Sequence, residues 1–247
     1  MTFLHPVALL GGAGRKRNLH AHVVQNLGSR IVRGETKAGD PFPSEAELGR
    51  EFGASRSVIR EAVKSLAARG LLESRTRTGI RVMPPMHWNL LDIDVLAWRY
   101  EAMPRAQFFQ ELFEIRGMIE PPAAALAAER STRAEVAGIA SAYAAMEKSD
   151  PSTEAAIEAD LRFHRAILGA SHNDLLLQMG NLIGVGLLVS YRISTDPYRV
   201  FLSSHKAVLS AIEKRRPAAA QKAMLELLAG TRDYLEVQLA LPRKKRA

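Results

Sequence analysis

Asp160, His164 and His205 are the residues whose types and spacing are best suited to bind a metal ion. On a helix, a separation of four residues places Asp160 and His164 on one face, about one turn apart. A carboxylate and an imidazole there can share a divalent cation, and His205 could reach the same cavity from a facing helix. Spacing alone favours the simpler alternative of a surface hydrogen-bonded pair and a buried structural histidine.

A second group of polar residues is suited to bind a small carboxylate or its hydroxyl groups. Arg116 lies in an apolar stretch, where a guanidinium can bind a carboxylate through two parallel hydrogen bonds. The competing interpretation is a structural salt bridge to Glu120, four residues further on. Asn173 is either a ligand contact or a helix cap, and Arg192 is a further candidate for binding hydroxyls.

The charges are unevenly distributed along the chain. The 247 residues carry a net charge of +8, from 34 Lys and Arg against 26 Asp and Glu. Residues 1–84 hold 14 basic and 7 acidic side chains, whereas residues 85–247 hold 20 and 19. A local excess of cations suits the neutralisation of nucleic-acid phosphates. Cysteine is absent, which excludes disulfides and Cys-ligated metal centres.

Residues 43–71, PSEAELGREFGASRSVIREAVKSLAARGL, predict two helices joined by a tight turn. Ser44 and Glu47 can form a capping box at the start of the first helix. Gly53 permits a left-handed turn, and Ser55 can cap the second helix. The second helix has an apolar face and a polar face, as a DNA-recognition helix does. The apolar face contains Val58, Ala62, Val63 and Leu66, and the polar face contains Arg56, Ser57, Arg60 and Lys64.

A hairpin is expected to follow this helix pair. Its strands are predicted at residues 71–74 and 80–83, around a turn that carries Arg75 and Arg77 and closes at Gly79. The two arginines can enter a minor groove or contact phosphates. Arginines of the helix are expected to read bases, and serine hydroxyls to hold phosphates. The expected DNA contacts are Ser44, Ser55, Arg56, Ser57, Arg60, Arg75, Arg77 and Gly79.

The rest of the chain predicts a mainly α protein, with a second domain of six or seven helices. Pro84 and Pro85 mark the boundary, because neither proline can continue a strand ladder. Pro121 and Pro122 are expected to kink or split one long helix. No stretch approaches about 20 uninterrupted apolar residues, so we expect a soluble, cytoplasmic protein.

The predicted organisation divides the chain into four parts. They are a tail at 1–17, a DNA-binding domain at 18–84, a helical domain at 85–242 and a basic tail at 243–247. Further helices are expected at 18–33, 92–101, 105–129, 133–148, 153–170, 174–193, 198–215 and 218–239.

The first domain resembles the winged helix-turn-helix of the GntR family. The matching residues are Phe52, Gly53, Ser55, Arg56, Val58, Arg60, Glu61 and Ala62, after the PSE that begins at Pro43. Ala46 stands where many relatives carry Arg, so one DNA contact is expected to be missing or supplied elsewhere.

The second domain resembles the FCD domain of the FadR subfamily. The matching groups are Glu114, Arg116, Glu120 and Pro121; Asp160, Phe163 and His164; Ala170, Ser171 and Asn173; and His205 to Ile212. Residues 87–98, HWNLLDIDVLAW, further resemble regulators of sugar-acid catabolism.

The FCD resemblance implies that Asp160, His164 and His205 are three of four ligands of zinc or another divalent metal. The fourth is usually a His on the last helix, and its position here is Leu227, which cannot bind a metal. Water or an effector carboxylate can complete the coordination, or the pocket binds its effector without a metal.

These observations predict a homodimeric transcriptional regulator, a repressor and not an enzyme. We expect a small carboxylate such as galactonate or gluconate to control its affinity for operator DNA, through Arg116, Asp160, His164, Asn173, Arg192 and His205. One alternative is a metal-dependent, hydrolase-like helical domain fused to a DNA-binding module, although no general-base or nucleophile motif accompanies the metal ligands. The other is a DNA-binding protein without an effector, which would discriminate little between operator and random DNA.

Overall fold

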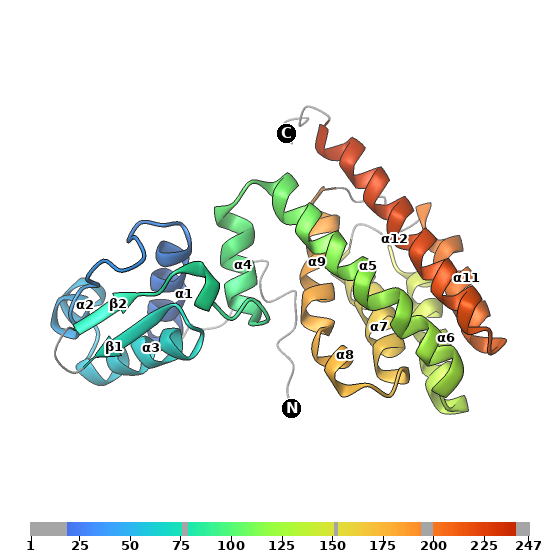
Figure 1. Cartoon of the computed structure of the whole chain (residues 1–247), viewed down its shortest axis with the longest axis horizontal. Helices are drawn as coiled ribbons and strands as arrows, with labels where there is room; N and C mark the ends of the chain where they lie inside the picture. The colour runs from blue at the N-terminus through green and yellow to red at the C-terminus, as the bar shows by residue number, and fades with distance from the viewer. Residues whose placement is uncertain (1–18, 76–78, 151–152, 194–199, 241–247) are drawn as a thin grey trace. The chain divides into compact units, whose positions relative to one another are not determined.

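The computed structural model describes residues 19–75, 79–150, 153–193 and 200–240. The chain divides into two compact units, Met1–Arg105 and Ala106–Ala247. Helices dominate both units, and among the described residues the strands are confined to one antiparallel pair in the first unit. This arrangement confirms the expected mainly α fold (Figure 1).

The first unit is a small helical domain with a two-stranded wing. The strands pair in antiparallel register from Leu72 opposite Val82 to Arg75 opposite Gly79, within one residue of the expected positions. Apolar side chains from all the helices and both strands form one core. The elements are α1 Leu19–Val32, α2 Glu45–Phe52, α3 Arg56–Ala68, β1 Leu72–Arg75, β2 Gly79–Val82, the short 3-10 turn η2 Pro85–His87 and α4 Ile93–Ala102.

The ends of α2 and α3 are set by the predicted capping residues. Ser44 and Glu47 form a complete capping box, and the side chain of Ser55 accepts a hydrogen bond from the backbone N–H of Val58. Gly53 adopts φ +59°, the left-handed conformation that the turn requires. One detail of the α3 prediction was wrong. Ile59 is fully buried in the core, whereas Val58 is only half-buried.

The boundary between the units lies further along the chain than the two prolines suggested. Residues 85–105 pack with the first unit, because the Trp98 ring of α4 lies directly against Gly28 of α1. A Cβ atom at position 28 would come within 2.3 Å of that ring. Arg69, at the end of α3, also pairs with Asp92 at 3.2 Å and Asp94 at 2.8 Å. Long-range packing and ion pairing therefore attach α4 to the first unit.

The second unit is a helical bundle in which α6 packs along α7 and α11 along α12 (Figure 1). Its main core contains Ile139, Tyr143, Met146, Phe163, Ile167, Val208, Leu209, Ile212, Met224 and Leu227, among others. The helices are α5 Arg105–Arg130, α6 Arg133–Lys148, α7 Glu154–Ala170, α8 Asp174–Gln178, α9 Gly180–Ile193, α11 Leu202–Glu213 and α12 Pro217–Ala240.

Two helix predictions in this unit need correction. Of the kink or split expected at the prolines 121 and 122, the split does not occur, because α5 continues through both to Arg130. The following alanines, Ala123 and Ala124, are fully buried, so core packing holds the helix together past the missing N–H groups. The single helix expected at 174–193 is two helices, α8 and α9, separated at Met179.

Within the described residues, none of the helices is both long enough and apolar enough to cross a membrane.

Candidate functional site

The N-terminal end of α3 presents the polar face that the sequence predicted. Ser55, Arg56, Ser57 and Arg60 are all exposed. The Arg60 side chain is 67% exposed and makes a loose ion pair, with 3.7 Å between its Nε and Glu45 Oε1. An ion pair this exposed contributes little to stability, so the guanidinium is available to another partner.

Ser44, like Ser55, uses its side chain to cap a helix. Its backbone N–H donates to Glu47 Oε2 at 2.8 Å, and its Oγ donates to the same oxygen at 2.7 Å. These hydrogen bonds lower the pKa of Glu47. Ser44 is therefore first of all a helix cap.

The wing is described at its strands but not at its tip. Gly79 adopts φ +77° at the start of β2, which suits the close of a hairpin. Arg77 and the side chain of Arg75 lie outside the described residues.

The second unit contains a cavity of about 40 Å³ in the middle of its helical bundle. This volume has room for roughly three particles of the size of a water molecule. Side chains from five helices, α5, α7, α9, α11 and α12, and from Phe201 form its wall. The lining residues are Arg116, Ile157, Asp160, His164, Leu187, Ser190, Phe201, His205, Leu227, Leu228 and Thr231.

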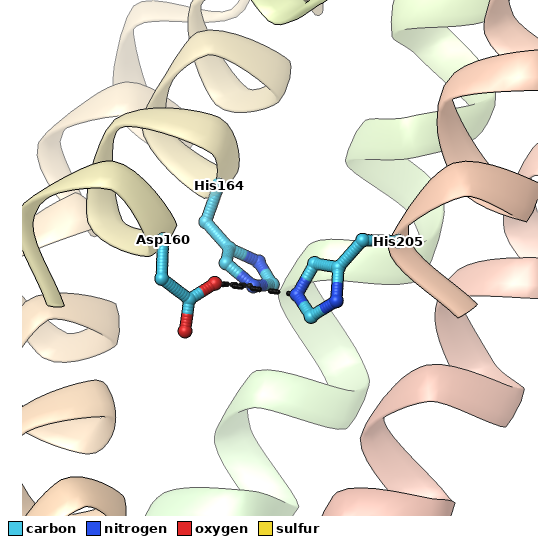
Figure 2. A group of neighbouring side chains, drawn as sticks. All are labelled: Asp160, His164 and His205. Atoms are coloured by element: carbon cyan, nitrogen blue, oxygen red, sulfur yellow. Dashed lines mark ion pairs between the residues drawn. The ribbon is translucent and has the colours of Figure 1, made fainter. Parts of the chain in front are cut away.

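Asp160, His164 and His205 come together on one side of this cavity (Figure 2). Asp160 and His164 project from neighbouring turns of α7, and His205 faces them from α11. Asp160 Oδ1 lies 3.3 Å from His164 Nε2 and 3.2 Å from His205 Nε2. One ligand atom from each residue lies within 4.8 Å of the other two.

The imidazoles are fixed by hydrogen bonds on their outer nitrogens. His164 Nδ1 lies 2.5 Å from Glu120 Oε2, and His205 Nδ1 lies 2.7 Å from the carbonyl oxygen of Phe201. Both acceptors require a proton on Nδ1, so the Nε2 atoms, which face Asp160, are the nitrogens that can bind a metal. This is the usual arrangement around a metal-binding histidine.

Asp160 also fits a role as a metal ligand. Its Oδ1 is buried and accepts no hydrogen bond from any described residue, although the two Nε2 atoms are close to it. A buried oxygen without a hydrogen bond is costly unless another group binds it. The carboxylate oxygen and the two imidazole nitrogens are donors that zinc prefers.

The charges around these histidines are strongly coupled. Burial opposes ionisation of Glu120, but Arg116 and His164 outweigh it and hold the pKa of Glu120 at about 2. Burial likewise opposes the charged form of His164, yet Glu120 and Asp160 raise the pKa of its ring to about 9. Burial also disfavours the Asp160 carboxylate, and the two histidines nevertheless lower its pKa. His164 must therefore give up its Nε2 proton to act as a ligand.

Arg116 forms the salt bridge to Glu120 that the sequence offered as one of two alternatives, and it also lines the cavity. Its Nε lies 2.5 Å from Glu120 Oε1, and both side chains are only 2% exposed. The residue also lines the cavity, and its Nη1 is buried without a hydrogen-bond partner among the described residues. One edge of the guanidinium is thus held by Glu120, while Nη1 retains an unused donor.

Of the other predicted contacts, Asn173 can be placed and Arg192 cannot. Asn173 is the N-cap of α8 and accepts from the backbone N–H groups of Leu175 and Leu176, so its side chain serves the helix and does not line the cavity. The side chain of Arg192 lies outside the described residues. Leu227 lines the cavity and is 1% exposed, so an apolar side chain occupies the position of the fourth ligand.

Three polar residues of the site were not identified from sequence. Ser190 and Thr231 line the cavity, and each hydroxyl donates at 2.8 Å to a backbone oxygen of its own helix. Glu120 was predicted as a partner of Arg116 and as part of the FCD resemblance, but not as a partner of His164. Its contact with His164 joins residues 44 positions apart, a separation at which helix periodicity gives no signal.

Both units match known family models. Residues 19–82 match the model of the bacterial regulatory proteins of the gntR family, and residues 111–230 match the FCD domain. Two solved structures share the fold. One, described by the words "Lar controls the expression of the Listeria monocytogenes agr system and mediates virulence", has a TM-score of 0.65 at 18% identity. The match covers 91% of this chain and 99% of that one. The other, the Streptococcus agalactiae GntR, has a TM-score of 0.51 at 24% identity, with 87% and 99% covered.

Two bacterial regulators are similar over most of their length. The Galactonate operon transcriptional repressor of Escherichia coli (strain K12) is 36% identical over 223 residues, which cover 85% of this chain and 93% of that protein. The HTH-type transcriptional regulator LutR of Bacillus subtilis (strain 168) is 30% identical over 214 residues, 83% and 95% of the two chains. With both domains matched and these relatives aligned nearly end to end, the chain belongs to the GntR family of bacterial transcriptional regulators and carries an FCD domain.

Proposed function

We propose that this regulator is a homodimeric repressor that leaves its operator when a small carboxylate binds in the FCD cavity. The observation that carries the proposal is the unpaired Nη1 donor of Arg116, on a residue that lines the same cavity as Asp160, His164 and His205. A buried guanidinium with a free donor suits a carboxylate ligand. A sugar acid such as galactonate or gluconate is the favoured class, because a relative at 36% identity is a galactonate operon repressor.

The cavity can hold a divalent cation such as zinc through three protein ligands. Asp160 supplies an oxygen, and His164 and His205 supply Nε2 atoms that are held in place through their Nδ1 atoms. Leu227 cannot add a fourth ligand, which leaves a coordination position for water or for an oxygen of the effector. A bound cation would supply a Lewis-acidic centre that attracts a carboxylate or hydroxyl oxygen.

The remaining lining residues suit the other parts of a sugar acid. Ser190 and Thr231 each have their O–H committed to the helix backbone, so their oxygens can accept hydrogen bonds from ligand hydroxyls. Leu187 and Leu228 form an apolar part of the wall, which suits the carbon chain of such a ligand. Because the cavity is small, a sugar acid requires its lining side chains to rearrange on binding. That requirement links occupancy of the cavity to the conformation of the bundle.

At the DNA end, Arg56 and Arg60 are proposed to read bases in a major groove, and Ser55 and Ser57 to contact phosphates. The wing arginines at 75 and 77 are proposed to add affinity. A two-fold dimer would place two α3 helices on the halves of a pseudo-palindrome in cytoplasmic DNA. Effector binding that favours another conformation would lower operator affinity by linkage.

The proposal is tested first by a ligand screen. Thermal unfolding of the wild-type protein should shift upward with galactonate or gluconate, and more so when Zn²⁺ is also present. DNA selected by the protein from a random-sequence pool then serves as the operator in fluorescence anisotropy. The effective acid should lower affinity for that DNA, and an absence of any effect across the sugar acids would contradict the proposal.

Variants of the cavity separate effector binding from DNA binding. Arg116→Ala should still bind the selected DNA but should no longer respond to the acid. Arg162→Ala is the matched control, because Arg162 is an exposed arginine of α7 with a loose ion pair to Glu158. Asp160→Asn and His205→Ala should likewise change the effector response and not operator recognition. Unchanged effector affinity in both of these variants would rule out a shared pocket.

A further inference from the structure

The Glu120 carboxylate contacts two residues that line the cavity, His164 of the proposed metal site and Arg116 of the proposed carboxylate site. We propose that Glu120 is a positioning residue that couples metal binding at His164 to carboxylate binding at Arg116. This inference rests on the proposed function of the cavity. The inference adds that the metal and the effector bind cooperatively, through the carboxylate of Glu120.

The geometry gives each carboxylate oxygen a separate partner. Oε1 lies 2.5 Å from Arg116 Nε, and Oε2 lies 2.5 Å from His164 Nδ1. The side chains of Glu120, Arg116 and His164 are each 2% exposed, so water does not compete for these contacts. Glu120 touches the outer nitrogen of His164 and is not one of the three residues grouped as metal ligands.

A structural salt bridge alone would not explain this arrangement. A buried ion pair is stable only when its remaining donors and acceptors are also satisfied. Both Glu120 oxygens are satisfied, but Arg116 keeps an unpaired, buried Nη1 and lines the cavity. The Nδ1 atom of His164 thus has its hydrogen-bond partner, whereas Arg116 Nη1, where a ligand carboxylate is expected, has none among the described residues.

The coupling follows from the chemistry of the imidazole ring. A divalent cation would replace the Nε2 proton of the His164 ring and so place one more positive charge beside it, which would strengthen the attraction between the ring and Glu120 Oε2. The carboxylate then neutralises Arg116 less effectively, because its charge is drawn toward the histidine. A less neutralised guanidinium binds an anion more tightly. By linkage, the anion must raise the affinity for the cation by the same factor.

The test compares Glu120→Gln with Glu114→Gln. Both residues lie on α5, but Glu114 is exposed and bonded only to Gln110 among the contacts described, so its variant controls for loss of one negative charge. Zn²⁺ affinity is measured by competition with a chromophoric chelator. Galactonate affinity is measured by calorimetry with and without Zn²⁺.

In the wild type, Zn²⁺ should raise galactonate affinity by about tenfold, within the usual range of coupling between sites. Glu120→Gln should weaken Zn²⁺ binding by about 10- to 100-fold, and the ratio of the two galactonate affinities should fall close to one. Glu114→Gln should behave as wild type. A Glu120→Gln protein that keeps the wild-type ratio would overturn the coupling but leave the proposed function intact. A wild type that binds neither Zn²⁺ nor galactonate would overturn both.

A second measurement needs no variant of Glu120 and so does not depend on its folding. The side-chain Nε–H resonance of Arg116 can be assigned by comparing NMR spectra of the wild type and Arg116→Lys. Addition of Zn²⁺ alone should move this resonance, because the Arg116 Nε–H shares Glu120 with His164. A resonance that stays in place while the His164 ring signals shift would overturn the coupling.

Discussion

The charged side chains of α3 are exposed to solvent, whereas those around the FCD cavity are buried. On α3, Arg60 is 67% exposed, and the nearest carboxylate oxygen is 3.7 Å away. Around the cavity, Arg116, Glu120 and His164 are 2% exposed and in contact at 2.5 Å. Exposed charges contribute little to folding and remain available to a partner, whereas buried charges must be paired for the unit to fold.

This contrast shows how one chain can bind two very different ligands. A DNA backbone is a large anion that exposed cations can neutralise without rearrangement of the core. A small carboxylate needs a donor that is already desolvated and held in position. Substitutions in the two regions should therefore differ in whether they change stability, binding or both.

The largest expected effect is on stability, at the buried network. Glu120→Ala leaves Arg116 and His164 without their shared carboxylate and should lower the free energy of unfolding by about 3 to 5 kcal/mol. Glu114→Ala, on the exposed face of the same helix, should change it by no more than about 0.5 kcal/mol. Urea unfolding followed by far-UV circular dichroism measures both. Equal losses would remove the contrast between the buried and exposed charges.

The next effect is on DNA binding, at the exposed surface. Arg60→Ala should cost about 1 to 3 kcal/mol in binding to selected DNA and much less on random DNA. Its free energy of unfolding should stay within about 0.5 kcal/mol of wild type, because the side chain is exposed. Lys222→Ala removes an exposed cation from α12 and should change neither DNA affinity nor the free energy of unfolding. Anisotropy titrations on both DNAs decide this, and equal losses on the two would argue against base readout by Arg60.

The smallest effect concerns an exposed carboxylate with a large pKa shift. Hydrogen bonds from the Thr132 backbone, and then from His172 and the Thr132 hydroxyl, hold the pKa of Glu135 at about 2, below its ordinary 4.5. Its stabilisation should thus be present above about pH 4.5 and be lost as the pH falls toward 2. Because the group is exposed, we expect less than about 1 kcal/mol.

Glu135→Gln tests this directly. The stability difference between wild type and variant, measured by urea unfolding, should be larger at pH 6 than at pH 3. A difference that is the same at both values would show that the Glu135 charge contributes nothing to the cap.

The sequence predicted those features that depend on near neighbours. Ser44 with Glu47, Gly53 and Ser55 define α2, the turn and α3 through contacts within a few residues, and all were identified correctly. The pairing of Asp160 with His164 followed from their spacing on one helix. Helix periodicity and capping chemistry act locally, so they can be read from sequence.

The features that were missed depend on packing between distant segments. Trp98 joins α4 to the first unit through Gly28, 70 positions away, and no local signal predicts that contact. Glu120 meets His164 across two helices, and so its second role appeared only in the structure. The prolines at 121 and 122 suggested a kink or a split, and the split is absent where buried alanines follow them.

The most direct test of the account is the response of operator binding to the effector. Fluorescence anisotropy of the selected DNA is measured with the wild type and with Arg116→Ala, each with and without galactonate, in the presence of Zn²⁺. We predict that galactonate weakens binding by the wild type at least tenfold and has no effect on Arg116→Ala, which binds the DNA normally. An equal response of the two proteins would contradict the central claim that Arg116 captures the molecule that releases the DNA.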